Sequence, residues 1–190
     1  MRRLMTIGDS QTRYPPSDVS WRHMVSRRQP DWLWAGSVTD GLGFRTDGRS
    51  GSQIQTHLDI LASTEIPAVV AQIGTPTDIT IMLGGNDINA GVSDSVFATR
   101  YSSLISQLKI PFPDARIWAF TICPFAALQA EMDLQRAKIM DGTSIPGIDY
   151  VIDLATLTYP TNAFLGDNLH LSPTGAMFVG DIISNAMASV

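Results

Sequence analysis

Residues 78–87 read Asp-Ile-Thr-Ile-Met-Leu-Gly-Gly-Asn-Asp. The nearly continuous apolar run Ile79–Leu83 is typical of a strand that is covered on both faces of a parallel sheet. Two glycines follow it and permit a close approach of the backbone to another group. Asn86 comes next, and its side-chain amide can donate hydrogen bonds into the space above the strand end. Taken alone, Gly84–Asp87 is slightly better explained as an ordinary glycine turn that caps the next segment than as part of a functional site.

Short apolar runs alternate with helical patterns along the whole chain. The predicted strands are Leu4–Ile7, Leu33–Ala35, Asp78–Leu83, Arg116–Thr121 and Tyr150–Leu154. The predicted helices are Asp18–Arg28, Ser52–Leu61, Ser93–Leu108, Ala127–Met140 and a last helix that Ser172-Pro173 starts and that runs to about Ala188. Parallel strands need crossover connections, so this order predicts an α/β fold: a flavodoxin-like three-layer α/β/α sandwich with a five-stranded parallel sheet. We expect one domain over residues 1–190.

The composition suits a globular domain and argues against several partners. Hydrophobic residues make up 44% of the 190 residues and charged residues 16%, which is unlike a disordered chain. The formal net charge of −5 argues weakly against nucleic acid as the main partner. No apolar run approaches the roughly 20 residues of a membrane span. The apolar stretch at the N-terminus is too short for a secretory signal, so we expect a cytoplasmic protein or a mature secreted form.

Four chemistry-bearing segments follow predicted strands, at the edge of a parallel sheet where ligands bind. Gly8-Asp9-Ser10 follows the first strand, and its glycine permits a tight turn that lifts the serine clear of the sheet. Asp167-Asn168-Leu169-His170 precedes the last helix, and its spacing lets a turn bring the carboxylate to the imidazole. Gly48-Arg49-Ser50-Gly51-Ser52 follows the second strand and offers backbone N–H groups to a developing negative charge. Gly84-Gly85-Asn86-Asp87 completes the set.

Each segment alone also has a purely structural interpretation, such as a capping serine, a loop histidine or a flexible glycine loop. Together, however, they supply a nucleophile, an oriented base and oxyanion donors at one sheet edge. These are the groups that acyl transfer needs.

In sequence order, these four segments resemble the conserved blocks of the SGNH (GDSL-type) hydrolases, and the resemblance covers the whole chain. It implies Ser10 as nucleophile, His170 as base and Asp167 as the residue that orients the base. It further implies an oxyanion hole formed by the N–H groups of Ser10 and Gly51 and by the Asn86 side chain. Gly48 is the alternative to Gly51 as the backbone N–H donor of its loop. The chain departs from the family pattern at Gln11, where Leu or Ile is usual, and at Leu171, where Pro is frequent. Neither change removes a reacting group, although Gln11 can alter the pocket lining.

Some phrases of the chain, such as Trp34-Ala35-Gly36-Ser37, Gly48–Ile54 and Val151–Leu154, look like the acetylxylan esterase type of carbohydrate esterase. This resemblance implies an acetyl ester of a carbohydrate as substrate and no cofactor or metal. A lysophospholipase- or thioesterase-like enzyme for longer acyl chains shares the same blocks. A binding domain without catalysis is a third interpretation, but such a domain would have lost one of the three triad residues. The sequence leaves the oligomeric state open.

Several other residues have mainly structural interpretations. Cys123 lies in an apolar run and is expected to be a buried thiol. His23 and His57 lie on predicted helices without partners at metal-ligand spacing. The tryptophans at 21, 32 and 34 favour core packing over a carbohydrate platform. Four side chains near the motif loops could line a groove, although ordinary loop packing or a solvated position is favoured for them: Arg45, Arg49, Phe125 and Tyr159.

Overall fold

The centre of the protein is a parallel sheet in which β1 (Arg3–Gly8) lies beside β5 (Asp78–Met82). In this computed structural model, residues 1–13, 20–39 and 45–190 are described. β6 (Arg116–Phe120) and β7 (Tyr150–Ile152) extend the sheet on the far side of β5, each parallel to its neighbour. The strand that carries Ser10 at its end is therefore interior to the sheet, with partners on both sides.

The prediction of five strands was wrong by two, because the second strand is divided. β2 (Leu33–Ala35) pairs with the first half of β1, and β4 (Arg45–Gly48) pairs with its last two residues. Between them, β3 (Val38–Thr39) pairs antiparallel with β4 and forms the sheet edge. Sequence reasoning missed β4 because its buried residues are polar, Thr46 and Asp47, and so form no apolar run.

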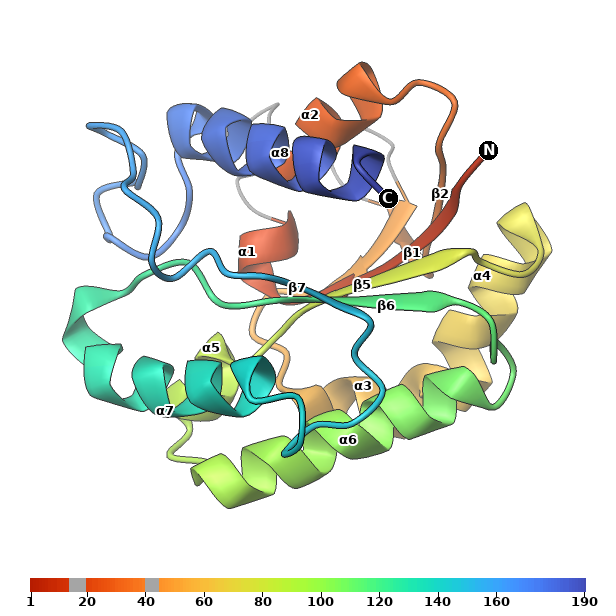
Figure 1. The fold of residues 1–190 in the computed structure, drawn as a ribbon, viewed down its shortest axis with the longest axis horizontal. Helices are drawn as coiled ribbons and strands as arrows, with labels where there is room; N and C mark the ends of the chain where they lie inside the picture. Colours follow the sequence, from red (N-terminus) through yellow and green to blue (C-terminus); the bar gives the residue numbers. More distant parts are fainter. Residues whose placement is uncertain (14–19, 40–44) are drawn as a thin grey trace.

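Helices cover both faces of the sheet, which confirms the three-layer arrangement (Figure 1). On one face lie α2 (Trp21–Arg28) and α8 (Pro173–Ala188), which pack against each other. The other face is covered by α3 (Ile54–Ile60), α4 (Ile66–Ile73), α6 (Asp94–Lys109) and α7 (Gln129–Met140). Each predicted helix is thus present; residues 18 and 19 of the first one lie outside the described residues.

The helix predicted at Ser52–Leu61 continues further than expected. After α3 the chain forms one π-helical stretch, η1 (Leu61–Glu65), and then α4. Pro67 lies in the first turn of α4, and a proline within an apolar periodic segment normally predicts that a helix ends before it. Two short helices, α1 (Ser10–Arg13) and α5 (Gly85–Asn89), also escaped prediction, since five residues or fewer carry no helical periodicity.

Successive side chains of the strands point to opposite faces of the sheet and pack into two hydrophobic cores. On β6, Ile117 and Ala119 face the core under α3, α4 and α6, whereas Trp118 and Phe120 face the core under α2 and α8. Trp21 is buried in the second core and packs edge-on against Trp34 and Phe120, with ring centroids 6.4 and 5.6 Å apart. The packing role expected for Trp21 and Trp34 is confirmed.

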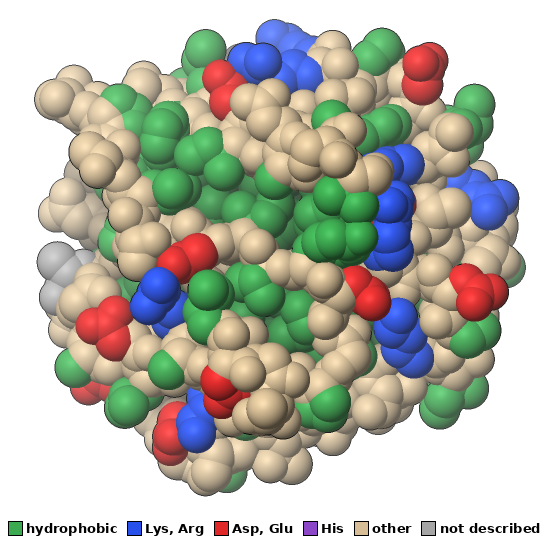
Figure 2. Space-filling view, in the orientation of Figure 1, with side chains coloured by type: hydrophobic (Ala, Val, Ile, Leu, Met, Phe, Trp, Pro, Cys, Tyr) green, Lys and Arg blue, Asp and Glu red, His purple; other side chains and the backbone are tan. Residues whose placement is uncertain are grey.

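Acidic and basic side chains are interspersed on the face drawn in Figure 2, where apolar side chains gather in the band between α8 and α7. No broad area of one charge sign is visible on this face. None of the helices in the described ranges is both long and apolar enough to cross a bilayer.

A substitution at Gly180, where α8 packs closely against α2, tests this helix contact. A Cβ atom at this position would lie 2.5 Å from Met24 Cβ and 2.9 Å from the Trp21 carbonyl oxygen. Replacing a helical glycine with alanine normally stabilises a helix by about 1 kcal/mol. We expect the opposite sign for Gly180→Ala, a loss of about 1–3 kcal/mol in the free energy of unfolding from overpacking. Urea denaturation measures it. Asn185→Ala, on the exposed side of the same helix, is the control; equal effects of both variants would contradict this packing.

Candidate active site

The structure brings together the three residues expected to form a triad, although Ser10 and His170 are 160 positions apart. Ser10 begins α1 directly after β1, and its Oγ lies 2.9 Å from His170 Nε2. His170 Nδ1 lies 2.7 Å from Asp167 Oδ2. The order of contacts is that of a nucleophile, a base and the carboxylate that orients the base.

A local turn holds the acid and the base in this arrangement. Asp167 Oδ1 accepts the backbone N–H groups of Leu169 and His170, each at 3.0 Å. Asn168 between them has φ of 55°, a left-handed conformation that Asn tolerates. The loop is closed by the Leu165 N–H, which donates to the His170 carbonyl at 2.8 Å. The spacing Asp-x-x-His therefore encodes a turn that presents both side chains.

The charge on Asp167 is fixed by these hydrogen bonds. Donation from the His170 ring, followed by the two backbone N–H groups, lowers the pKa of the Asp167 carboxyl to about 2. An ionised carboxylate keeps the proton of His170 on Nδ1 and leaves Nε2 to accept the proton of Ser10.

The turn that carries Ser10 depends on Gly8 and Asp9. A Cβ atom at Gly8 would lie 2.0 Å from Thr12 Oγ1, so only glycine fits there. Asp9 is buried and accepts the Gln11 N–H with its Oδ1 at 2.8 Å. Burial raises the pKa of the Asp9 carboxyl to about 6.

Asn86 lies beside Ser10, at the start of α5. The residue before this helix, Gly84, has φ of 136°, and a Cβ there would lie 2.5 Å from Gln135 Oε1. Asn86 Nδ2 donates to the Ser52 carbonyl at 3.0 Å and lies 3.4 Å from Asp9 Oδ2. An amide nitrogen has two hydrogens, so one remains for a weak contact with Asp9 or for an oxyanion bound at Ser10.

The two glycines that compete as oxyanion donors differ in their hydrogen bonds. The Gly48 N–H donates to Thr46 Oγ1 at 2.8 Å and is therefore already engaged. Gly51 lies in an exposed turn with φ of 78°, and its N–H has no hydrogen bond to any residue in the described ranges. Gly51 thus remains the candidate donor of this loop.

A cavity of about 150 Å³ opens beside Ser10 and Asn86. Six apolar side chains form much of its wall: Ile88, Ile122, Phe125, Leu128, Met132 and Leu169. A cavity of this volume and lining is large enough to hold a benzene-sized group. Ser10 therefore borders an apolar compartment that exceeds the size of one methyl group.

Gln11 lines this cavity, in keeping with its departure from the family pattern. Its side chain is buried and connects two loops of the site. Oε1 accepts the Cys123 N–H at 3.2 Å, and Nε2 donates to the Leu169 carbonyl at 3.4 Å. Gln11 thereby links the nucleophile segment to the loop of His170 and to the end of β6.

Of the four side chains considered for a groove, only Phe125 lines the cavity. Arg49 pairs with Glu65 at 3.2 Å, and the Tyr159 ring packs against Phe164 and Phe178. Arg45 is exposed at the start of β4. The packing interpretation thus holds for Arg49 and Tyr159.

Other structural interpretations can also be checked. Cys123 is a buried thiol, as expected, and burial raises its pKa to about 12. His23 Nδ1 lies against Ser20 at the start of α2. Among the residues that the structure describes, no three His, Cys, Asp or Glu side chains gather as metal ligands would.

Sequence reasoning missed the partner of His57. His57 Nδ1 lies 2.8 Å from Glu65 Oε1, and both side chains are fully buried. The eight-residue separation matches no metal-ligand spacing. Glu65 also lies beyond Leu61, where the predicted helix ends, so no local signal in the sequence points to this pair.

No protein-family model matches the sequence, and no curated protein matches it. Solved structures do match. A family 3 carbohydrate esterase from Talaromyces cellulolyticus aligns with a TM-score of 0.78 and 20% identity, over 100% of this chain and 97% of that one. An acetyl esterase mutant solved with an acetate ion aligns with a TM-score of 0.79, 20% identity and the same coverage. A lipase/acylhydrolase from Enterococcus faecalis aligns at 0.74 and 18% identity, over 100% and 96%.

The chain therefore has the fold that carbohydrate esterases of family 3 share with lipolytic proteins of the G-D-S-L type. This confirms the fold that the resemblance to SGNH hydrolases implied. At these identities, the alignments establish the fold, and the chemistry rests on the residues of this chain.

Asp167→Asn tests the role of the carboxylate in orienting His170. We expect kcat for a carboxylic ester to fall by about 10²-fold or more, because the neutral amide no longer favours the reactive tautomer. The half-exposed position of Asp167 keeps the loss below the ~10⁴ typical of a buried triad Asp. Steady-state kinetics with a nitrophenyl ester measures it.

Asp141→Asn is the matched control. Asp141 Oδ1 accepts the N–H groups of Thr143 and Ser144 in a similar exposed turn, and its pKa is likewise about 2, but no histidine faces it. Equal activity of the Asp167 and Asp141 variants would contradict the role of Asp167.

Proposed function

We propose that the protein is a serine esterase that hydrolyses carboxylic esters through an acyl-enzyme. The single observation that carries this proposal is the chain of contacts from Ser10 Oγ to His170 and on to Asp167, at 2.9 and 2.7 Å. These contacts occur at the carboxyl edge of a parallel sheet, beside a cavity.

In the proposed reaction, Ser10 Oγ attacks the ester carbonyl while His170 Nε2 takes the hydroxyl proton. The N–H groups of Ser10 and Gly51 and the Asn86 amide stabilise the tetrahedral oxyanion. His170 then returns the proton to the leaving alcohol, and the acyl group remains on Ser10. Water, activated by His170 in turn, attacks the acyl-enzyme, releases the acid and restores the serine. The reaction needs no metal or organic cofactor.

For the substrate, we propose a short acyl ester, acetyl above all, on a carbohydrate. Two structural neighbours of the chain are described as a family 3 carbohydrate esterase and an acetyl esterase, which supports this choice. A second candidate is an acylhydrolase for longer chains, favoured by the six apolar side chains of the cavity and by its volume of about 150 Å³. A non-catalytic carbohydrate-binding domain is disfavoured because all three triad residues are present and in contact.

Ser10→Ala tests the nucleophile. We expect ester hydrolysis and labelling by a fluorophosphonate probe to disappear, because both need the same hydroxyl. The thermal unfolding midpoint should remain close to that of the wild type, since the Ser10 side chain is only partly buried. Ser63→Ala replaces an exposed serine that does not line the cavity; it is the control and should keep full labelling. Wild-type labelling in the Ser10 variant would refute the assignment.

The size of the cavity sets an upper limit on the acyl chain. For the proposed acetyl esterase we expect kcat/KM to be highest for acetyl and to persist for butanoyl. It should fall steeply beyond about six carbons, since a 150 Å³ cavity holds a benzene-sized group. Nitrophenyl esters of two to twelve carbons measure the profile. A maximum at eight carbons or more would favour the long-chain acylhydrolase instead.

A further inference from the structure

The carbonyl oxygen of Gly8, two residues before Ser10, meets three polar groups from one neighbouring segment. The Arg49 N–H donates to it at 2.9 Å, and Ser52 Oγ lies at 3.2 Å. His57 Nε2 lies 3.1 Å from the same oxygen. The end of the strand that carries the nucleophile is thus held by the loop that carries Gly51.

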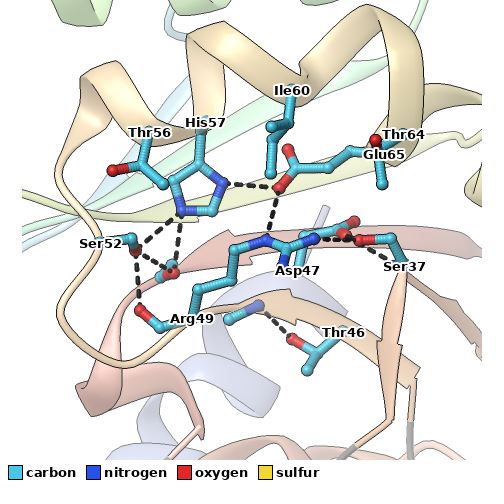
Figure 3. A network of polar contacts seen from close by, with 12 residues as sticks. Ser37, Thr46, Asp47, Arg49, Ser52, Thr56, His57, Ile60, Thr64 and Glu65 are labelled. Carbon is cyan, nitrogen blue, oxygen red and sulfur yellow. Dashed lines mark hydrogen bonds and ion pairs between the residues drawn. The ribbon is translucent and has the colours of Figure 1, made fainter.

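Ser52, His57 and Glu65 repeat the contact order of a catalytic triad inside the protein (Figure 3). Ser52 Oγ lies 3.0 Å from His57 Nε2, and His57 Nδ1 lies 2.8 Å from Glu65 Oε1. The three side chains are almost completely inaccessible, with exposed fractions of 4%, 0% and 0%. No substrate can reach this serine, so a structural role is the consistent interpretation.

Charged neighbours fix the carboxylate at the far end of this group. Arg49 Nε donates to Glu65 Oε1 at 3.2 Å, and Arg49 Nη2 donates to the hydroxyl of Ser37. Ser37 in turn donates to buried Asp47. Burial, reinforced by the charge of Glu65, raises the pKa of Asp47 to about 6. Removing one partner from such a buried set leaves a charge without compensation, which costs stability.

Ser52 connects this buried group to both candidate oxyanion donors. Its carbonyl accepts the Asn86 amide at 3.0 Å. Its N–H and Oγ both reach the Arg49 carbonyl, at 3.1 and 2.8 Å, and so close the turn that contains Gly51. A shift of Ser52 would therefore move the Asn86 amide and the Gly51 N–H relative to Ser10.

We propose that His57 and Glu65 are positioning residues for the oxyanion hole, which they align by holding Ser52. This proposal rests on the esterase function proposed above, because only an acyl-transfer site needs an oxyanion hole. Neither side chain lines the cavity beside Ser10, so both act through Ser52 and touch no substrate. The positions of the oxyanion donors matter for the rate, because a misplacement of about 1 Å at a reacting centre can lower the rate about 10²-fold.

Ser52→Ala is the first test, because it removes one hydroxyl and leaves the backbone turn in place. We expect kcat for a nitrophenyl acetate substrate to fall roughly 10-fold to 10²-fold. KM should change little, since the oxyanion contacts strengthen only in the transition state. Ser184→Ala is the matched control: Ser184 is a buried hydroxyl on α8 that accepts one hydrogen bond from Gln29, far from the cavity. Its kcat should equal that of the wild type.

Combination with Asn86→Ala separates positioning from a loss of stability. If Ser52 acts by aligning Asn86 and the Gly51 N–H, the double variant should lose less rate than the product of the two single losses, because residues that act together are not additive. His57→Gln and Glu65→Gln should show the same drop in kcat and the same non-additivity. If either buried variant fails to fold, Ser52→Ala still decides the question.

The outcomes are distinguishable. Wild-type kcat in Ser52→Ala, or rate losses that simply multiply in the double variant, would overturn the positioning role while leaving the esterase intact. A wild-type protein that neither hydrolyses the ester nor labels at Ser10 with a fluorophosphonate would overturn the proposed function, and the positioning role with it. A selective fall in kcat that is smaller in the Asn86→Ala background than in the wild type would support both.

Discussion

The hydrogen bonds that converge on the Gly8 carbonyl are the constraint on which the geometry of the site depends. The carbonyl ends β1 and accepts from the Arg49 N–H at 2.9 Å, with Ser52 Oγ and His57 Nε2 close by. A buried carbonyl oxygen has two lone pairs, and leaving it without a hydrogen-bond donor is unfavourable. Because these partners belong to the segment that contains Gly51, the Gly8 carbonyl holds the segments of Ser10 and Gly51 together.

The sheet supplies the framework for this anchor. β1 lies between the β2–β4 segment and β5, so the segments after β1, β4 and β5 emerge side by side at one edge. Ser10, Gly51 and Asn86 follow these three strands, and the loop before α8 brings His170 across from the end of the chain. The hydrophobic cores on both faces pack against these strands and support the edge at which the residues meet.

The cavity connects this edge to the second half of the chain. Its apolar wall comes mainly from residues after β6 and in α7, whereas Ser10, Asn86 and His170 come from α1, α5 and the last loop. The apolar wall and the polar residues of the candidate site are thus contributed largely by different segments.

The sequence by itself determined the features that depend on short-range geometry. Gly8-Asp9-Ser10 and Asp167–His170 were recognisable because a turn of three or four residues sets their conformation, and the structure confirms the turn at Asp167 in two backbone hydrogen bonds. Tertiary structure alone decided what depends on distant segments. The polar strand Arg45–Gly48, which pairs with β1, and the cavity wall belong to this group. Their physical cause is burial of polar or scattered side chains against partners far along the chain, which leaves no local period for a sequence to display.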